Sequence, residues 1–275
     1  MSRIETKFEQ LRQSGRKALV TFLTAGDPTP DRTVELMHAL VAGGADILEL
    51  GVPFSDPLAD GPVIQRASER ALAHDVALED ILAMVRQFRE ADATTPVVLM
   101  GYSNPIEHMG VAHFGERAHA AGVDGVLTVD MPPEEAEEWG RPLSEAGLDP
   151  ILLAAPTTSP QRLDAILGLT RGFVYYVSMA GVTGGSGLDV ADVAEHVAAI
   201  RQRTGLPVAV GFGVRDADSA AAVAEVADAV VVGSALVRTV EDCVENSDCT
   251  GLPAALRAQV ADLRHGLDRA SGDKG

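Results

Sequence analysis

Residues 47–61 read Ile-Leu-Glu-Leu-Gly-Val-Pro-Phe-Ser-Asp-Pro-Leu-Ala-Asp-Gly, an apolar strand with one acid that then breaks into a turn-rich loop with two more. An acid within an apolar strand costs free energy unless it is paired, hydrogen-bonded or kept protonated. Side chains alternate along a strand, so Glu49 faces away from Leu48 and Leu50. The leucines suit packing against outer helices, which directs Glu49 toward the inner face of a sheet.

The same unit, a short apolar strand followed by a helix, recurs along the chain. Eight strands are expected, at residues 18–23, 47–50, 96–101, 125–129, 150–153, 172–178, 207–211 and 229–232. Continuously apolar strands separated by helices indicate a parallel sheet covered by helices. Eight units favour a (β/α)8 TIM barrel over an open doubly wound sheet, as one domain over residues 1–275. The helical spacing of Ile4, Phe8 and Leu11 predicts an extra N-terminal helix.

The composition argues against several classes of function and cellular location. The 275 residues carry a formal charge of −18, which argues against nucleic acid or an anionic membrane as a partner. No apolar run approaches the roughly 18 residues of a membrane span, and no secretory signal is visible, so a cytoplasmic protein is expected. Cys243 and Cys249 are accordingly predicted to be reduced thiols.

Barrel enzymes place their active sites at the C-terminal ends of the strands, where the loop at 51–61 begins. Burial of Glu49 there would raise its pKa and suit it to acid–base catalysis near neutral pH. The alternative is a structural glutamate paired with an arginine. Asp60 has two open interpretations, catalysis or capping of a helix that begins at Pro62. Asp56 is interpreted as a loop or interface residue.

Two glycine turns follow the seventh and eighth strands, at Gly211-Phe212-Gly213 and Gly233-Ser234. Glycines let backbone N–H groups approach an anion, and a helix N-terminus favours negative charge, so a phosphate site is predicted there. Tight turns without a ligand are the alternative. The glycine-rich segment 181–187 is interpreted as a lid or a phosphate-contacting loop, with a plain linker as the alternative.

Other residue types disfavour the common aldolase mechanisms. None of Lys7, Lys17 and Lys274 is expected at a strand end, which argues against a Schiff-base aldolase. The seven histidines form no ligand-like cluster, so no metal is expected. The mechanism that remains is acid–base catalysis by carboxylates on a small phosphorylated substrate.

Residues 48–62 closely resemble the signature of the tryptophan synthase α subunit family. The resemblance continues in family order from about residue 7 to 267, through segments 24–28, 102–105, 180–184, 211–213 and 232–235. It implies a (β/α)8 barrel that splits indole-3-glycerol phosphate into indole and glyceraldehyde 3-phosphate by a retro-aldol step, without a cofactor. Alternatives are a stand-alone lyase on the same barrel, a non-catalytic regulatory subunit or a phosphosugar isomerase.

By the same resemblance, Glu49 and Asp60 would be the catalytic acids. The residues expected to bind substrate are Phe22, Met100, Leu127, Tyr175, Thr183, Gly184, Phe212, Gly213, Gly233 and Ser234. Tyr175 and Tyr176 are adjacent on one strand, so only one of them can face the barrel mouth.

The resemblance also implies a partner. Family members pair with a separate β subunit that contains pyridoxal phosphate, in an α2β2 heterotetramer. The residues that match the family contact surface are Pro53, Phe54, Asp56, Pro57, Asn104 and Pro105. An aromatic residue such as Phe54 in a polar loop suits an interface.

Overall fold

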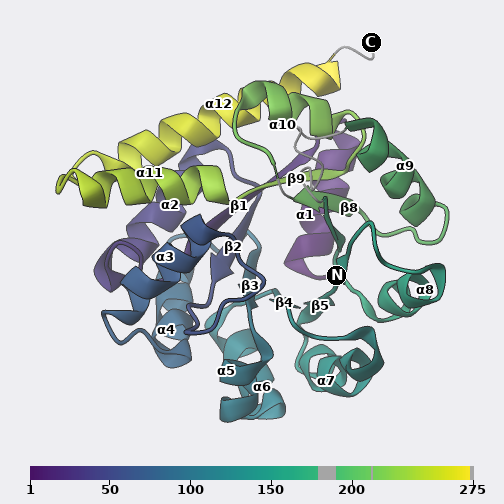
Figure 1. Ribbon diagram of the computed structural model, residues 1–275, viewed down its shortest axis with the longest axis horizontal. Coiled ribbons are helices and arrows are strands. Elements are labelled where there is room, and N and C mark those ends of the chain that lie inside the picture. The colour runs from purple at the N-terminus through teal and green to yellow at the C-terminus, as the bar shows by residue number, and fades with distance from the viewer. Residues whose placement is uncertain (179–189, 212, 273–275) are drawn as a thin grey trace.

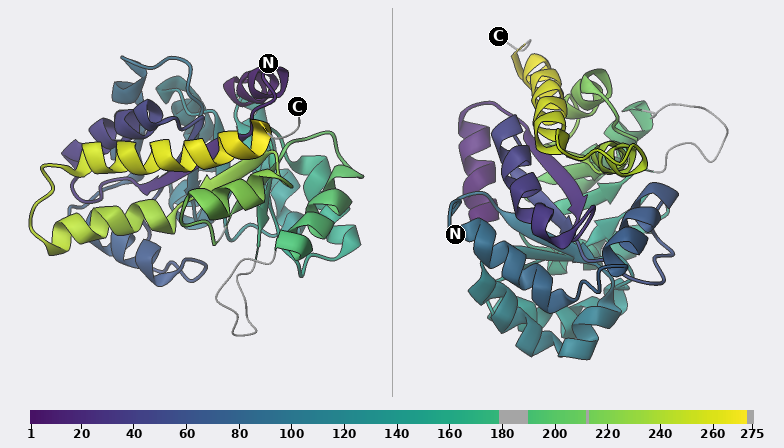
Figure 2. Two further views of the ribbon diagram at one scale, coloured as in Figure 1. Left: turned by 90° about the horizontal axis from the view of Figure 1, so that it is seen from above. Right: turned by 90° about the vertical axis from the view of Figure 1, so that its left-hand side faces the viewer.

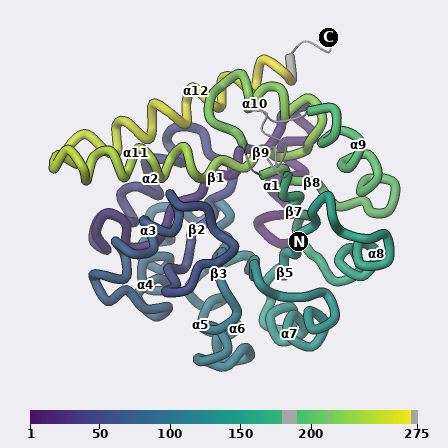
Figure 3. The backbone as a smooth tube through the Cα atoms, viewed as in Figure 1, coloured from purple at the N-terminus to yellow at the C-terminus, as the bar shows by residue number. Residues whose placement is uncertain are grey.

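Nine parallel strands form one ring in the computed structural model, which describes residues 1–178, 190–211 and 213–272 (Figure 1). The order around the ring is β5-β4-β3-β2-β1-β9-β8-β7-β6, and Figure 3 shows the chain advancing steadily around it. The strands are β1 (Ala18–Thr24), β2 (Ile47–Gly51), β3 (Val97–Gly101), β4 (Gly125–Thr128), β5 (Asp149–Ile151), β6 (Leu153–Ala154), β7 (Val174–Val177), β8 (Val208–Gly211) and β9 (Ala229–Val232).

The predicted barrel is confirmed, with one difference at the fifth strand. The segment expected as one strand at 150–153 is split, because Leu152 separates β5 from β6. β5 pairs with β4 and β6 pairs with β7, so the chain changes neighbour at this residue. The two ends of the strand order are thus joined covalently through Leu152, and the barrel is nearly closed there.

Helices surround the ring on its outside, except for the N-terminal helix, which lies behind the strands (Figure 1). They are α1 (Arg3–Gln13), α2 (Thr33–Gly43, after the 3-10 turn η1, Pro30–Arg32), α3 (Pro62–Leu72), α4 (Leu78–Arg89), α5 (Ser103–Met109), α6 (Val111–Ala121), α7 (Pro133–Glu145), α8 (Pro160–Leu169), α9 (Val190–Arg201), α10 (Ala217–Ala224), α11 (Ser234–Glu245) and α12 (Leu252–Gly272). The long α12 packs against α2, α10 and α11 (Figure 2). The extra helix α1 places Ile4 and Leu11 in the cluster that fills the barrel interior.

The alternation along β2 separates two cores. Leu48 and Leu50 belong to the cluster between the strands and the helices, whereas Ile47 belongs to the cluster inside the barrel. Glu49 shares the inward face with Ile47, as the period of two requires.

Three aspartates repeat one structural role at the N-terminal ends of strands. Asp46, Asp124 and Asp228 directly precede β2, β4 and β9. Each carboxylate accepts a hydrogen bond, at 2.8–2.9 Å, from a backbone N–H at the start of a neighbouring strand. The donors are Leu19 of β1, Val97 of β3 and Val208 of β8. Each carboxylate also pairs with an arginine, at 2.6–2.9 Å. These carboxylates fix the register of three strand pairs.

We expect Asp124→Ala to lower the free energy of unfolding by about 3 kcal/mol, because it leaves the buried Val97 N–H without an acceptor and removes the carboxylate that neutralises the half-buried guanidinium of Arg89. Urea unfolding measures the change. Glu79→Ala, which breaks the exposed pair with Arg117, is the control and should cost less than about 1 kcal/mol. Equal losses for the two variants would contradict the role assigned to Asp124.

The prediction of two reduced cysteines was wrong, because Cys243 and Cys249 form a disulfide. Cys243 lies in the last turn of α11 and Cys249 lies just before α12. The chain reverses between these helices and brings the two Cα atoms to 4.9 Å, within disulfide range. The disulfide depends on this turn between α11 and α12, which composition and cellular compartment do not reveal. None of the helices in the described ranges is long and apolar enough to cross a membrane.

Candidate active site

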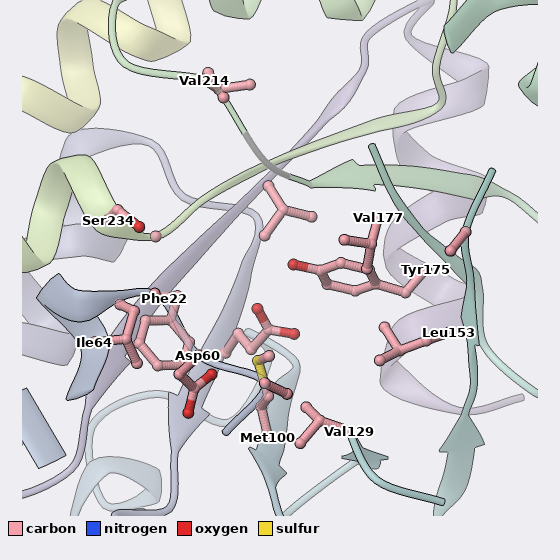
Figure 4. Close-up of a pocket in the computed structure, with 17 residues that line it drawn as sticks. Phe22, Asp60, Ile64, Met100, Val129, Leu153, Tyr175, Val177, Val214 and Ser234 are labelled. Carbon is pink, nitrogen blue, oxygen red and sulfur yellow. The ribbon is translucent and has the colours of Figure 1, made fainter. Parts of the chain in front are cut away.

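A cavity of about 320 Å³ opens at the C-terminal ends of the strands (Figure 4). Its walls are mostly apolar, with two acids on one side and glycine turns on another. The lining residues are Phe22, Glu49, Ala59, Asp60, Gly61, Ile64, Met100, Val129, Leu153, Ala155, Tyr175, Val177, Gly213, Val214, Val231, Gly233 and Ser234. An apolar pocket with a few converging polar groups is the usual form of a small-molecule site.

Glu49 projects from the middle of β2 into this cavity, beside Phe22 of β1 and Val98 of β3 in the strand register. Its exposed fraction is 2 %, and neither carboxylate oxygen has a hydrogen-bond partner among the described residues. Burial raises the pKa of Glu49 to about 8. The alternative interpretation, a structural glutamate paired with an arginine, was therefore wrong. Glu49 is placed to give and take a proton near neutral pH.

Asp60 lies at the end of the loop after β2 and is held by Tyr102. The Tyr102 hydroxyl donates to Asp60 Oδ2 at 3.2 Å and accepts the Ala59 N–H at 3.0 Å. Burial raises the pKa of Asp60, although the Tyr102 hydrogen bond acts in the opposite direction. Gly61, not Asp60, is the N-cap residue of α3, and no side chain caps this helix. The capping interpretation of Asp60 was wrong.

The glycine turns after β8 and β9 meet at another side of the cavity. Gly213 has a φ of +85°, which favours glycine, and Gly233 is the N-cap residue of α11. Ser234 begins this helix and lies at the cavity (Figure 4). The first N–H groups of a helix lack intrahelical partners and carry partial positive charge, so this corner can bind an anion.

The two tyrosines of β7 face opposite sides of the sheet. Tyr175 lines the cavity, with its hydroxyl pointing inward (Figure 4), whereas Tyr176 packs in the outer core and stacks on His196. Gly211 on the neighbouring strand makes room for Tyr175, because a Cβ there would lie 2.5 Å from the Tyr175 hydroxyl oxygen.

We therefore expect Gly211→Ala to push the Tyr175 ring into the cavity and to destabilise the chain by about 1–3 kcal/mol. Substrate affinity should fall at the same time, because the ring would occupy part of the binding space. Ligand titration and thermal unfolding measure the two effects. The double variant Gly211→Ala/Tyr175→Leu removes the hydroxyl and the two ring carbons that lie within 2.9 Å of the added Cβ and should recover part of the affinity; no recovery would contradict the explanation.

Comparison with known proteins decides the family. Residues 8–263 match the family model described as "Tryptophan synthase alpha chain". The chain belongs to this family. It is 58% identical over 268 residues to the tryptophan synthase alpha chain of Alkalilimnicola ehrlichii, covering 98% of this chain and 97% of the relative.

Solved structures agree with the family assignment. The alpha subunit from Legionella pneumophila strain Paris is 45% identical, with a TM-score of 0.92 and coverage of 98% and 99% of the two chains. A chain from the tryptophan synthase of Mycobacterium tuberculosis is 40% identical, with a TM-score of 0.87 and coverage of 97% and 98%. The reaction of the family is the cleavage of indole-3-glycerol phosphate, a carbon–carbon lyase reaction.

Most of the residues expected in the family's substrate site gather around this cavity. The ones that line it are Glu49, Asp60, Phe22, Met100, Tyr175, Gly213, Gly233 and Ser234. Leu127 does not line it; this residue is fully buried in the cluster inside the barrel. The predictions for Thr183, Gly184 and Phe212 lie outside the described residues.

Tyr102 was missed as a site residue, although it directly follows β3 and so stands where barrels place functional groups. This position was the signal available in the sequence, whereas the contact with Asp60 across 42 positions leaves no local pattern. The apolar lining residues Ile64, Val129, Leu153 and Val177 were also missed, because nothing distinguishes them from core residues in the sequence. Within the described ranges no cluster of three or more potential metal ligands exists.

The loop expected to contact a partner is mostly accessible. Phe54 is half-buried and stacks on Tyr102, with the ring centroids 5.0 Å apart. Asp56 and Asn104 are exposed, Pro57 and Pro105 are half-buried, and Pro53 is buried. Leu58 in the same loop is 92% exposed.

Proposed function

We propose that this chain uses Glu49 and Asp60 to split indole-3-glycerol phosphate into indole and glyceraldehyde 3-phosphate. The observation that carries the proposal is the unpaired, buried Glu49 with a pKa of about 8, in an apolar cavity that ends at an anion-binding corner. The apolar walls suit the indole ring, and the helix N-terminus suits the phosphate.

Glu49 moves both protons of the reaction. Its protonated form gives a proton to C3 of the indole, which makes the ring an electrophilic indolenine. The resulting carboxylate takes the proton of the hydroxyl on the adjacent glycerol carbon. That C–O bond becomes the aldehyde carbonyl as the carbon–carbon bond breaks, and the bonding electrons return to the indole ring. Glu49 ends protonated, ready for the next turnover.

Asp60 stabilises the charge that appears between these two steps. Protonation at C3 places positive charge on the indole nitrogen, and a carboxylate that accepts the indole N–H lowers the energy of this state. The Tyr102 hydroxyl, which donates to Asp60, favours the ionised form that this role requires.

The remaining substrate-binding residues have positioning roles. Gly184, Gly213, Gly233 and Ser234 hold the phosphate. Phe22 and Met100 shape the indole pocket, with Tyr175 beside the reacting carbons, and Leu127 supports the pocket only from the interior of the barrel. Substrate-binding roles are also proposed for Thr183 and Phe212, which lie outside the described residues.

The partner is a β subunit that carries pyridoxal phosphate and receives the indole, in an α2β2 assembly. Its contact surface on this chain is Phe54, Asp56, Pro57, Asn104 and Pro105, with the exposed Leu58; the buried Pro53 only shapes the loop. The Phe54–Tyr102 stack and the Tyr102–Asp60 hydrogen bond connect this surface to the active site. Binding of the partner there can change the position of Asp60.

Ligand binding tests the substrate class. Indolepropanol phosphate, which keeps the ring and phosphate but lacks the cleavable hydroxyl, should bind the purified chain much more tightly than a linear phosphosugar. Isothermal titration measures both affinities. Tighter binding of the phosphosugar would contradict the proposal and favour an isomerase.

A further inference from the structure

Two helices begin at the active site, one beside Asp60 and the other at the anion-binding corner. α3 starts at Pro62, two residues after Asp60, and α11 starts at Ser234 in the anion-binding corner. The helices lie side by side along the outside of the barrel (Figure 1). Their relative position therefore sets the distance between Asp60 and the phosphate corner.

A four-residue ion cluster joins these helices away from the cavity. Glu241 of α11 accepts two hydrogen bonds from Arg66 of α3, at 2.5 and 2.9 Å, and one from Arg70 of α3 at 3.2 Å. Arg70 also makes a two-point contact with Asp27 in the loop after β1, at 2.7 and 2.8 Å. The cluster thus connects three segments.

The carboxylates of the cluster are removed from solvent. Asp27 and Glu241 have exposed fractions of 2 % and 7 %. The arginines, Arg66 foremost through its hydrogen bond, lower the pKa of Glu241 to about 2, so this carboxylate is charged at neutral pH. A planar guanidinium held at two points fixes orientation as well as distance, which a single contact cannot do.

Apolar side chains between the ion cluster and the cavity connect the two helices to the cavity walls. Phe22 of β1, Val63 and Ala67 of α3 and Val237 of α11 form one small core cluster. Phe22 also lines the cavity, and Ile64, which packs on this cluster, does so as well. A displacement of α3 relative to α11 would move cavity walls together with Asp60.

We propose that Asp27, Arg66, Arg70 and Glu241 are positioning residues that lock α3 to α11 and thereby hold Asp60 at the correct distance from the phosphate corner. This inference rests on the proposed function, since it assigns the two ends of the cavity to the two ends of one substrate. None of the four residues lines the cavity, so their effect is transmitted through the helices.

Two probes separate a positioning role from a general loss of stability. Inorganic phosphate requires only the α11 corner, whereas indolepropanol phosphate spans both ends of the site. Glu241→Gln should weaken indolepropanol phosphate binding roughly tenfold, because a small displacement of Asp60 from the phosphate corner disrupts interactions that depend on orientation. The binding of inorganic phosphate should remain nearly unchanged. Glu241→Asp, which keeps the charge, should recover part of the loss.

The matched control is Asp46→Asn. It weakens a buried ion pair with Arg264 at the opposite end of the barrel and should destabilise the chain without altering the ratio of the two affinities. Arg70→Lys, which loses the two-point contacts, replaces Glu241→Gln if that variant does not fold. Equal weakening of both probes, or the same ratio change in Asp46→Asn, would overturn the inference. A wild-type chain that fails to bind indolepropanol phosphate would instead contradict the proposed function.

Discussion

Glu49→Gln is expected to lower the rate of indole release at least about 10³-fold, because general acid–base catalysis contributes 10²–10⁴-fold and Glu49 performs both proton transfers. Glutamine has nearly the same shape and cannot give or take the proton. Substrate affinity should change little, since Glu49 makes no hydrogen bond that organises the cavity among the described residues. Steady-state kinetics should show a fall in kcat with KM nearly constant.

The same substitution should make the protein more stable at neutral pH. Burial raises the pKa of Glu49 from an ordinary value of 4.5 to about 8. A group whose pKa is raised on folding contributes stability that is complete below the unfolded pKa and is lost as pH rises through the folded pKa. Between pH 4.5 and 8, stability should therefore decrease with increasing pH, by about 3 kcal/mol at pH 7.

Glu49→Gln removes this loss, because the glutamine side chain is neutral at every pH. The free energies of unfolding of the two proteins should be similar below pH 4.5, and the variant should be the more stable at pH 7. Urea unfolding at several pH values measures the difference. Parallel pH curves would show that Glu49 titrates normally in the folded chain, and its assignment as proton donor would then be wrong.

Asp60→Asn is the second substitution with a large expected effect. It removes the negative charge that stabilises the cationic indolenine, and loss of one such electrostatic contact typically costs about 10²–10³-fold in kcat. Tyr102→Phe is the matched comparison: it keeps the carboxylate and removes only the hydroxyl that holds Asp60 Oδ2 at 3.2 Å. We expect a smaller loss for Tyr102→Phe than for Asp60→Asn, measured by indole release. The opposite order would indicate that Tyr102, not Asp60, acts on the substrate.

Glu49 illustrates what could be predicted from the sequence. An acid between two leucines on a strand with a period of two can only point inward, and its burial and raised pKa follow directly. Asp60 was ambiguous because Asp-Gly-Pro is also a helix-start pattern, and only the position of Gly61 as N-cap residue decides against capping. The eight-unit barrel was likewise visible in the strand spacing, apart from the break at Leu152.

Contacts between residues distant in sequence account for what could not be predicted. Tyr102 reaches Asp60 across 42 positions, and Arg70 reaches Glu241 across 171. Neither pair leaves a local pattern in the chain. The Cys243–Cys249 disulfide spans only six positions, but it depends on a helix reversal whose geometry composition does not reveal.

The most direct test of the proposed reaction is the simultaneous quantification of indole and glyceraldehyde 3-phosphate formed from indole-3-glycerol phosphate by the purified chain, beside folded Glu49→Gln. The wild-type chain should release the two products in equal amounts, and the variant should release them at least about 10³-fold more slowly. A folded Glu49→Gln protein that forms both products at the wild-type rate would contradict the account.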